Sequence, residues 1–211
     1  MFGDIKNNFN IVEGAYKKIK SLYFYSKDKL FERLKISAFE SDEKLMLGTF
    51  NMLAEYLRDP QKDESIVYIE GLIKQIKYKV FPKRFIDKES KQNVITTKIK
   101  EKDLSSVNFL IDMPIELMLL DSIWTLMVGK IAYDNKSISI NNYANQFQTK
   151  KIFKEGEDLI ESIDFSSNRL FKPYFQQYTY WRNNAIDIIE NKYNSKQDTI
   201  LISLDLTGYF Y

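Results

Sequence analysis

Apolar side chains recur at intervals of three and four residues over much of this chain, and this spacing constrains its fold more than any other feature. Met46, Phe50, Leu53 and Leu57 follow it, after Ser41 or Asp42 as the expected helix cap. The series ends before Pro60, because a residue that precedes proline is driven out of the helical region. Only seven Gly and four Pro occur in 211 residues, which disfavours an architecture of many turns. The sequence therefore predicts a mainly α fold.

Further helices are predicted on both sides of this one. Residues 4–36 have helical spacing with a break near Ser26–Asp28, and residues 64–80 form another helix that Phe81-Pro82 stops. Pro114 suits the first turn of a helix. That helix is expected to be largely buried, because it carries the apolar residues Leu117, Leu119, Leu120, Ile123, Trp124 and Val128. Residues 173–193 give the clearest helix, followed by a turn at Asn194–Asp198.

Strands are expected in few places. Residues 86–106 are polar and rich in Lys, and we interpret them as an irregular or hairpin connection, followed by a short strand at Val107–Ile111. Thr199–Leu204 is continuously apolar and rich in β-branched residues, which is typical of a buried strand. Because one strand does not make a sheet, we expect this one to pair with further residues of a longer polypeptide or with another molecule.

Composition excludes several kinds of chemistry. The chain has no His and no Cys, so catalytic triads with His, thiolate nucleophiles and disulfides are all excluded. Carboxylates remain, and they favour hard divalent cations such as Mg²⁺. The net charge is only +2, so no global basic field indicates nucleic acid. We expect a cytoplasmic protein without a membrane partner, since neither a signal peptide nor a spanning apolar stretch is recognisable.

The segment from Ile200 to Tyr211 carries the candidate catalytic residue. An apolar strand there delivers Asp205 at its end, followed by Leu206 and, after two small residues, by three aromatic side chains. Nucleotidyl transfer needs two divalent ions held by carboxylates on rigid strands, and Asp205 with the Leu206 carbonyl would supply part of such a site. The alternative is that Asp205 is an ordinary turn residue.

Two other groups of side chains have competing interpretations. Tyr174, Tyr178 and Trp181 form a stripe that is either core or a surface on which bases stack, and core is the expected role. Glu161, one helical turn after Glu157 and Asp158, is interpreted as part of a solvated face.

Taken together, several segments of this sequence resemble reverse transcriptases, in particular the bacterial group associated with phage defence and abortive infection. Leu204-Asp205-Leu206-Thr207-Gly208-Tyr209-Phe210-Tyr211 resembles the first palm motif, and residues 168–185 resemble the helix that leads from fingers to palm. Phe81-Pro82-Lys83-Arg84-Phe85 is similar to an early fingers element. Residues 111–129, with Asp121, Trp124 and Gly129, resemble the next fingers helix, and Asn142–Phe147 resembles the loop that ends this region.

The resemblance implies a division of the chain and a set of roles. Residues 1–80 would be a helical N-terminal region, 81–195 the fingers, and 196–211 the first strand and first carboxylate of a palm sheet. Asp205 would be catalytic and would bind Mg²⁺ together with Leu206, and Phe210 would screen the 2′-hydroxyl of the nucleotide. The remaining nucleotide-binding candidates are Lys83, Arg84, Arg169 and Lys172. The expected partners are an RNA template, a primer and deoxynucleotides.

Two departures from the family pattern bear on activity. Gln146 stands where family members often have Arg, and no Tyr-x-Asp-Asp segment occurs in the 211 residues. We therefore expect the missing palm and thumb to come from the same polypeptide or from a second chain, and these residues alone to be inactive. The alternative function is a non-enzymatic helical binding module that pairs its final strand with a partner's sheet.

Overall fold

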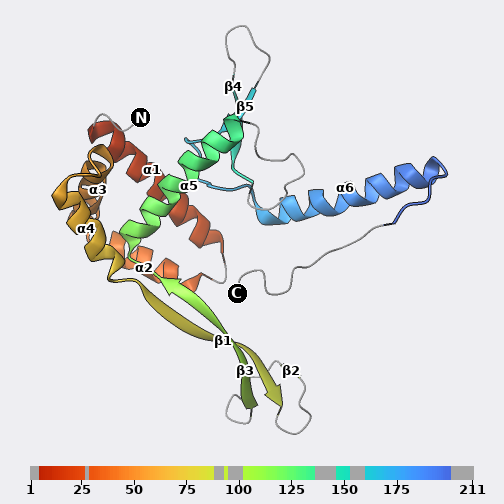
Figure 1. Cartoon of the computed structure of the whole chain (residues 1–211), viewed down its shortest axis with the longest axis horizontal. Helices are drawn as coiled ribbons and strands as arrows, with labels where there is room; N and C mark the ends of the chain where they lie inside the picture. The colour runs from red at the N-terminus through yellow and green to blue at the C-terminus, as the bar shows by residue number, and fades with distance from the viewer. Residues whose placement is uncertain are drawn as a thin grey trace. The chain divides into compact units, whose positions relative to one another are not determined.

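The computed structural model describes residues 5–26, 29–87, 93–94, 102–135, 146–152 and 160–200. In this part of the chain helices predominate, accompanied by two small antiparallel sheets, so the mainly α prediction is confirmed (Figure 1). The chain divides into two compact units, Met1–Thr125 and Leu126–Tyr211. The expected final strand, Thr199–Leu204, lies mostly outside the described residues.

Three helices form the core of the first unit: α1 (Ile5–Tyr25), α2 (Leu30–Glu40) and α3 (Glu43–Arg58). They pack through one aromatic ring from each helix, with the Tyr16 centroid 5.4 Å from Phe50 and 5.9 Å from Phe39. Fully buried aliphatic side chains such as Val12 and Leu53 fill the space between them. The predicted helix break between α1 and α2 is therefore confirmed.

The two ends of α3 follow from local chemistry. The Asp42 carboxylate accepts a hydrogen bond from the backbone N–H of Leu45 at 2.9 Å, so Asp42 rather than Ser41 is the cap. The helix stops at Asp59, as the following Pro60 predicts.

The expected helix at residues 64–80 is shorter than predicted. Helix α4 spans Asp63–Ile73, and Lys77 then begins the long strand β1 (Lys77–Asp87), which pairs antiparallel with β3 (Lys102–Asp112) and with the short β2 (Asn93–Val94). Figure 1 shows β1 and β3 as a twisted ribbon. Pro82 does not end the element but lies at a shift in register between Pro82 and Arg84, where the ladder tolerates a residue without an N–H. The described residues of 86–106 belong to these paired strands, in agreement with the hairpin interpretation.

Ion pairs at the end of β3 connect the hairpin with the helices of this unit. Asp112 accepts a hydrogen bond from Lys35 of α2 and lies 2.9 Å from the Lys79 ammonium on β1. The Lys35 hydrogen bond, followed by that from Lys79, lowers the pKa of Asp112. Lys35 also donates to the backbone oxygen of Met113 at 2.7 Å, which fixes the chain just before the next helix.

That helix, α5, spans Ile115–Asp134 and follows Pro114 as expected. Leu119 and Ile123 are buried, whereas Trp124 is 64% exposed and Val128 42% exposed. The prediction of the buried face was therefore wrong for Trp124 and Val128. Each follows a buried position by one or two residues, and a helix turns about 100° per residue, so apolar character alone did not identify the covered side.

The second unit has a small core of Leu126, Ile163 and Leu170, against which Phe147 and Phe171 pack. Strands β4 (Thr149–Ile152) and β5 (Ile160–Ile163) pair antiparallel, and the Phe147–Phe171 bridge adds a third segment beside β4. Backbone hydrogen bonds hold this segment: Gln148 donates to Leu170 at 3.0 Å and Lys172 donates to Gln146 at 2.8 Å.

Helix α6 (Tyr174–Asn194) starts after Pro173 and ends in the predicted turn, where Gln197 N–H donates to the Lys192 carbonyl at 2.9 Å. Among the helices of the described residues, none is long and apolar enough to cross a membrane.

Candidate nucleic-acid interface

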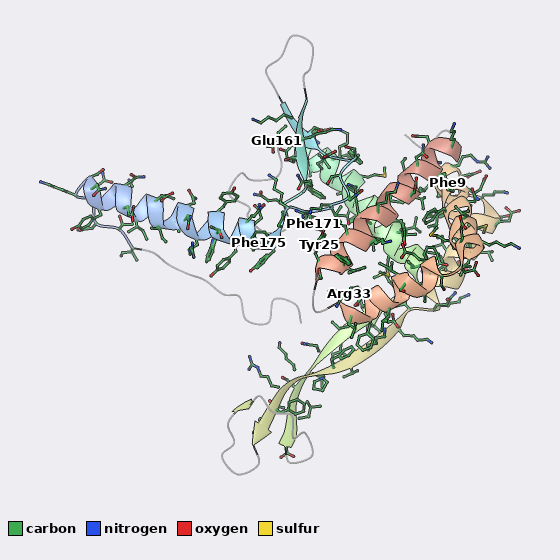
Figure 2. The ribbon with its side chains drawn as sticks, turned by 180° about the vertical axis from the view of Figure 1, so that it is seen from behind. Phe9, Tyr25, Arg33, Glu161, Phe171 and Phe175 are labelled. Carbon is green, nitrogen blue, oxygen red and sulfur yellow. The ribbon has the colours of Figure 1, made fainter. Side chains whose placement is uncertain are left out.

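The Glu161 carboxylate is the centre of a polar cluster in the second unit. It accepts hydrogen bonds from the hydroxyl groups of Thr149 and of Tyr133, the latter at 3.0 Å, and Lys172 lies 3.8 Å from it. The Thr149 hydrogen bond contributes most to lowering the pKa of Glu161. Burial, and then the bond to the carboxylate, raises the pKa of Tyr133 to about 12. Figure 2 places Glu161 on the paired strands.

This cluster borders an open pocket of about 500 Å³. Polar side chains surround it, from β4, β5, the first turns of α6 and the residues just before β4 and α6: Gln146, Gln148, Thr149, Glu161, Lys172, Gln176, Gln177 and Tyr180. The volume is in the range of small-molecule sites, but those are mostly apolar, and this lining offers amide, hydroxyl and ammonium groups instead. The pocket therefore suits a ligand with many hydrogen-bonding groups.

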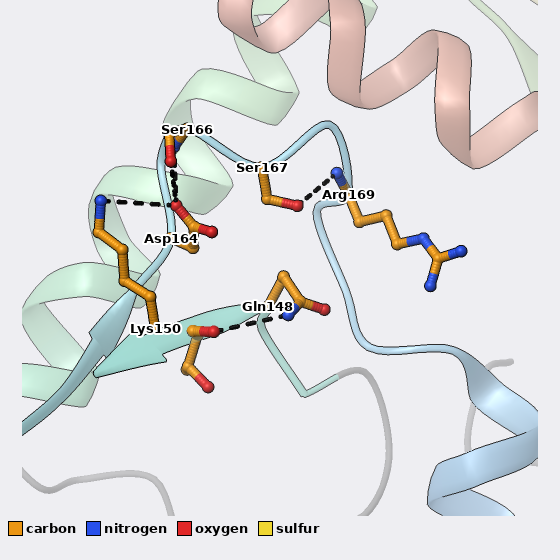
Figure 3. Close-up of polar contacts among 7 residues, drawn as sticks. Gln148, Lys150, Asp164, Ser166, Ser167 and Arg169 are labelled. Atoms are coloured by element: carbon orange, nitrogen blue, oxygen red, sulfur yellow. Dashed lines mark hydrogen bonds and ion pairs between the residues drawn. The ribbon is translucent and has the colours of Figure 1, made fainter.

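A short loop carries Arg169 next to this sheet. The Asp164 carboxylate accepts hydrogen bonds from the Ser166 hydroxyl at 2.6 Å and from the Ser166 N–H at 3.0 Å, and Lys150 lies 3.6 Å away. The Ser166 hydroxyl is the main cause of the lowered pKa of Asp164. The Ser167 hydroxyl then accepts a hydrogen bond from the Arg169 N–H at 3.0 Å, and Figure 3 shows the Arg169 side chain pointing away from Asp164.

The four basic residues predicted to bind nucleotide belong to different units. Lys83 and Arg84 are exposed on β1 of the first unit, at the shift in register. Arg169 and Lys172 belong to the second unit, where Arg169 is exposed and Lys172 is half-buried beside Glu161. Arg169 and Lys172 are thus three positions apart in the second unit, whereas Lys83 and Arg84 belong to the first unit.

The predicted metal site cannot be assembled from the described side chains. Asp205, Leu206 and Phe210 lie outside the described residues. Within the residues that the structure does cover, no three or more His, Cys, Asp or Glu side chains are grouped so that they could hold a metal ion.

The aromatic stripe of α6 is not core, so that expectation was wrong. Tyr174 is 73% exposed, Tyr178 48% and Trp181 49%, and the only buried side chain of this fully described helix is Gln177. Figure 2 shows side chains standing out along the length of α6, with Phe175 labelled in its first turn. The helical spacing was read correctly, but in the part of the chain that the structure describes these three rings are exposed.

Sequence reasoning also missed the role of Glu161. The spacing from Glu157 and Asp158 suggested a helical face, but Glu161 lies on β5, where it binds Thr149 and Tyr133 from other elements. The alternation Ile160-Glu161-Ser162-Ile163 was too short to indicate a strand by itself.

Comparison of the chain with protein-family models, curated proteins and solved structures gave no match.

Proposed function

We propose that these residues are the fingers and the beginning of the palm of an RNA-directed DNA polymerase of the phage-defence type. The observation that carries the proposal is the order of elements near the end of the chain. Basic Arg169 and Lys172 precede the long helix α6, a hydrogen-bonded turn follows, and the apolar segment that contains Asp205 comes next. This is the order that the resemblance to reverse transcriptases leads one to expect.

The second unit supports the proposal by its chemistry. Lys172 is held at the start of α6 by a backbone bond to Gln146 and by the nearby Glu161 carboxylate. A phosphate approaching Lys172 would compete with Glu161, whose side chain is half exposed and has two hydroxyl donors of its own. The site is therefore able to exchange one anionic partner for another without leaving Glu161 unsatisfied.

The chemistry of the proposed reaction requires more carboxylates than these residues provide. In such a polymerase Mg²⁺ ions neutralise the charge of the phosphates, and Asp205 with the Leu206 carbonyl would hold one of them. One carboxylate does not supply enough ligands to hold two ions, so the 211 residues alone are expected to incorporate no nucleotide.

The test uses the whole open reading frame that encodes these residues, together with any neighbouring reading frame that supplies a Tyr-x-Asp-Asp segment. We expect Mg²⁺-dependent incorporation of deoxynucleotides on a primed RNA, and Asp205→Asn should abolish it. The matched control is Asp198→Asn, an exposed carboxylate seven residues earlier, which should leave incorporation unchanged.

Two outcomes would contradict the proposal. The first is undiminished incorporation by the Asp205→Asn protein. The second is a reading frame that ends at Tyr211 and has no encoded palm-containing partner, which would favour the helical binding module.

A further inference from the structure

The first half of α6 presents three aromatic rings side by side on its surface. Tyr174, Tyr178 and Trp181, which we call the aromatic ladder, are each about half exposed or more. Their ring centroids are 6.2 Å apart for Tyr174 and Tyr178 and 5.6 Å for Tyr178 and Trp181, with interplanar angles of 33° and 42°. At ~1.5 Å per residue the ladder extends over about 10 Å of the helix.

The charged residues that surround the ladder in the sequence are all basic. Between Phe165 and Ile186 the charged residues are Arg169, Lys172 and Arg182, and this stretch contains no Asp or Glu. The carboxylates of the helix, Asp187 and Glu190, lie in its second half. Arg182 directly follows Trp181, and its guanidinium is held at the surface by hydrogen bonds of 3.0 and 3.2 Å to the Asn183 side chain. The ladder therefore suits a ligand that combines flat rings with negative charge.

The large apolar side chains around the ladder are all aromatic, with no large aliphatic side chain among them. From Tyr174 to Ala185 the helix has no Leu, Ile, Val or Met. The other residues of this stretch are the further rings Phe175 and Tyr180, Ala185, and polar or cationic residues: Gln176, Gln177, Thr179, Arg182, Asn183 and Asn184. A protein partner docked on a helix face usually meets aliphatic anchors at helical spacing. Rings interleaved with polar and cationic side chains are instead typical of surfaces on which unpaired bases stack.

We propose that the aromatic ladder stacks the unpaired bases of a single-stranded RNA, with Arg182 beside the backbone phosphates. The choice of RNA rests on the proposed function, in which RNA is the template. A base inserted between two neighbouring rings would stack on both at ~3.5 Å and would need these rings about 7 Å apart. The neighbouring rings of the ladder are closer than that. The bases therefore lie against the solvent-facing sides of the rings instead of between them.

The chain allows a direct optical test, because its two tryptophans are Trp124 and Trp181. Trp124→Phe leaves Trp181 as the only indole. The probe is an oligouridylate of about 12 nucleotides, within the length that single-strand sites cover. We expect saturable quenching of Trp181 fluorescence by this RNA.

Substitutions distinguish stacking from general electrostatic attraction. In the Trp124→Phe background, Tyr178→Ala should weaken binding on the order of 5- to 150-fold, the loss expected for one stacked base. Tyr193→Ala is the matched control: it is 79% exposed on the same helix, but 12 residues beyond Trp181, or about 18 Å. It should not change binding. Arg182→Gln should reduce the slope of log affinity against log salt by about one.

Four results would overturn the inference: no quenching by RNA; equal losses for Tyr178→Ala and Tyr193→Ala; tighter binding of oligodeoxythymidylate than of the RNA; or self-association of the chain that Tyr178→Ala removes. Circular dichroism of the Tyr178→Ala protein checks that the helix is retained. These measurements need only the 211-residue chain, so they do not depend on incorporation. If the complete reading frame incorporated no nucleotide although the RNA quenched Trp181 fluorescence, the polymerase proposal alone would be contradicted.

Discussion

Gly129 of α5 lies directly under the ring of Phe147, which makes Gly129→Ala a sharp test of how the second unit is packed. A Cβ at this position would be 2.2 Å from the Cζ atom of Phe147 and 2.5 and 2.9 Å from its two Cε atoms. Ordinary contact begins near 3.4 Å, so the ring would have to move by more than 1 Å. Phe171 is packed against the same ring, with centroids 5.4 Å apart, and restricts that movement.

Two opposing effects determine the size of the change. Alanine favours a helix over glycine by about 1 kcal/mol. Overpacking of a core costs about 1–3 kcal/mol, and a clash with three ring atoms belongs at the upper end. We therefore expect Gly129→Ala to lower the free energy of unfolding by about 2 kcal/mol, or Tm by about 4–8 °C in a chain of this length.

The structure provides a control and a rescue. Gly48 in α3 has nothing within 4 Å of the position that a Cβ would occupy, so Gly48→Ala should raise the stability by about 0.5–1 kcal/mol. Phe147→Leu removes all three clashing atoms and should restore part of the stability of Gly129→Ala. Urea unfolding followed by circular dichroism measures each variant. If Gly129→Ala proved as stable as Gly48→Ala, or if Phe147→Leu gave no rescue, the packing of α5 against this segment would be wrong.

Two further predictions follow from hydrogen bonds to carboxylates. Because the pKa of Glu161 is lowered in the fold, its contribution to stability is full above the ordinary value of 4.5 and is lost as the pH falls below it, so Glu161→Gln should reduce the loss of stability below that pH. An unchanged pH profile of urea midpoints would contradict this role. Asp42→Ala should cost about 1 kcal/mol by leaving the Leu45 N–H without its cap, whereas Asp42→Asn should cost almost nothing; equal losses in thermal melts would contradict the cap.

Features that depend on nearby residues were predicted well from the sequence. The Asp42 cap and the stop before Pro60 depend on chemistry within four residues, and the structure has both. Helix α6 was also predicted closely, because Pro173 and a long series at helical spacing define it locally.

Features that depend on distant partners were predicted poorly. The residues of β1 after Lys77 form a strand because β3, which starts 25 positions later at Lys102, supplies its hydrogen bonds. Nothing within residues 64–80 indicates that partner. Glu161 likewise obtains its role from Thr149 and Tyr133, which other elements bring to it. The predicted site residues Asp205, Leu206 and Phe210 remain predictions.

The aromatic ladder shows why exposure, and not spacing, bears on function in this helix. Helical spacing of Tyr174, Tyr178 and Trp181 is equally compatible with a core and with a binding surface, and only their exposure separates the two. Stacking on these rings would be as strong before the chemical step as during it, because the rings touch bases and not the reacting phosphate. Such uniform binding lowers KM for a template without raising kcat. If both proposals hold, the ladder and Asp205 would be independent in their effects: the first would determine how tightly a strand is held, and the second whether nucleotides are joined to it.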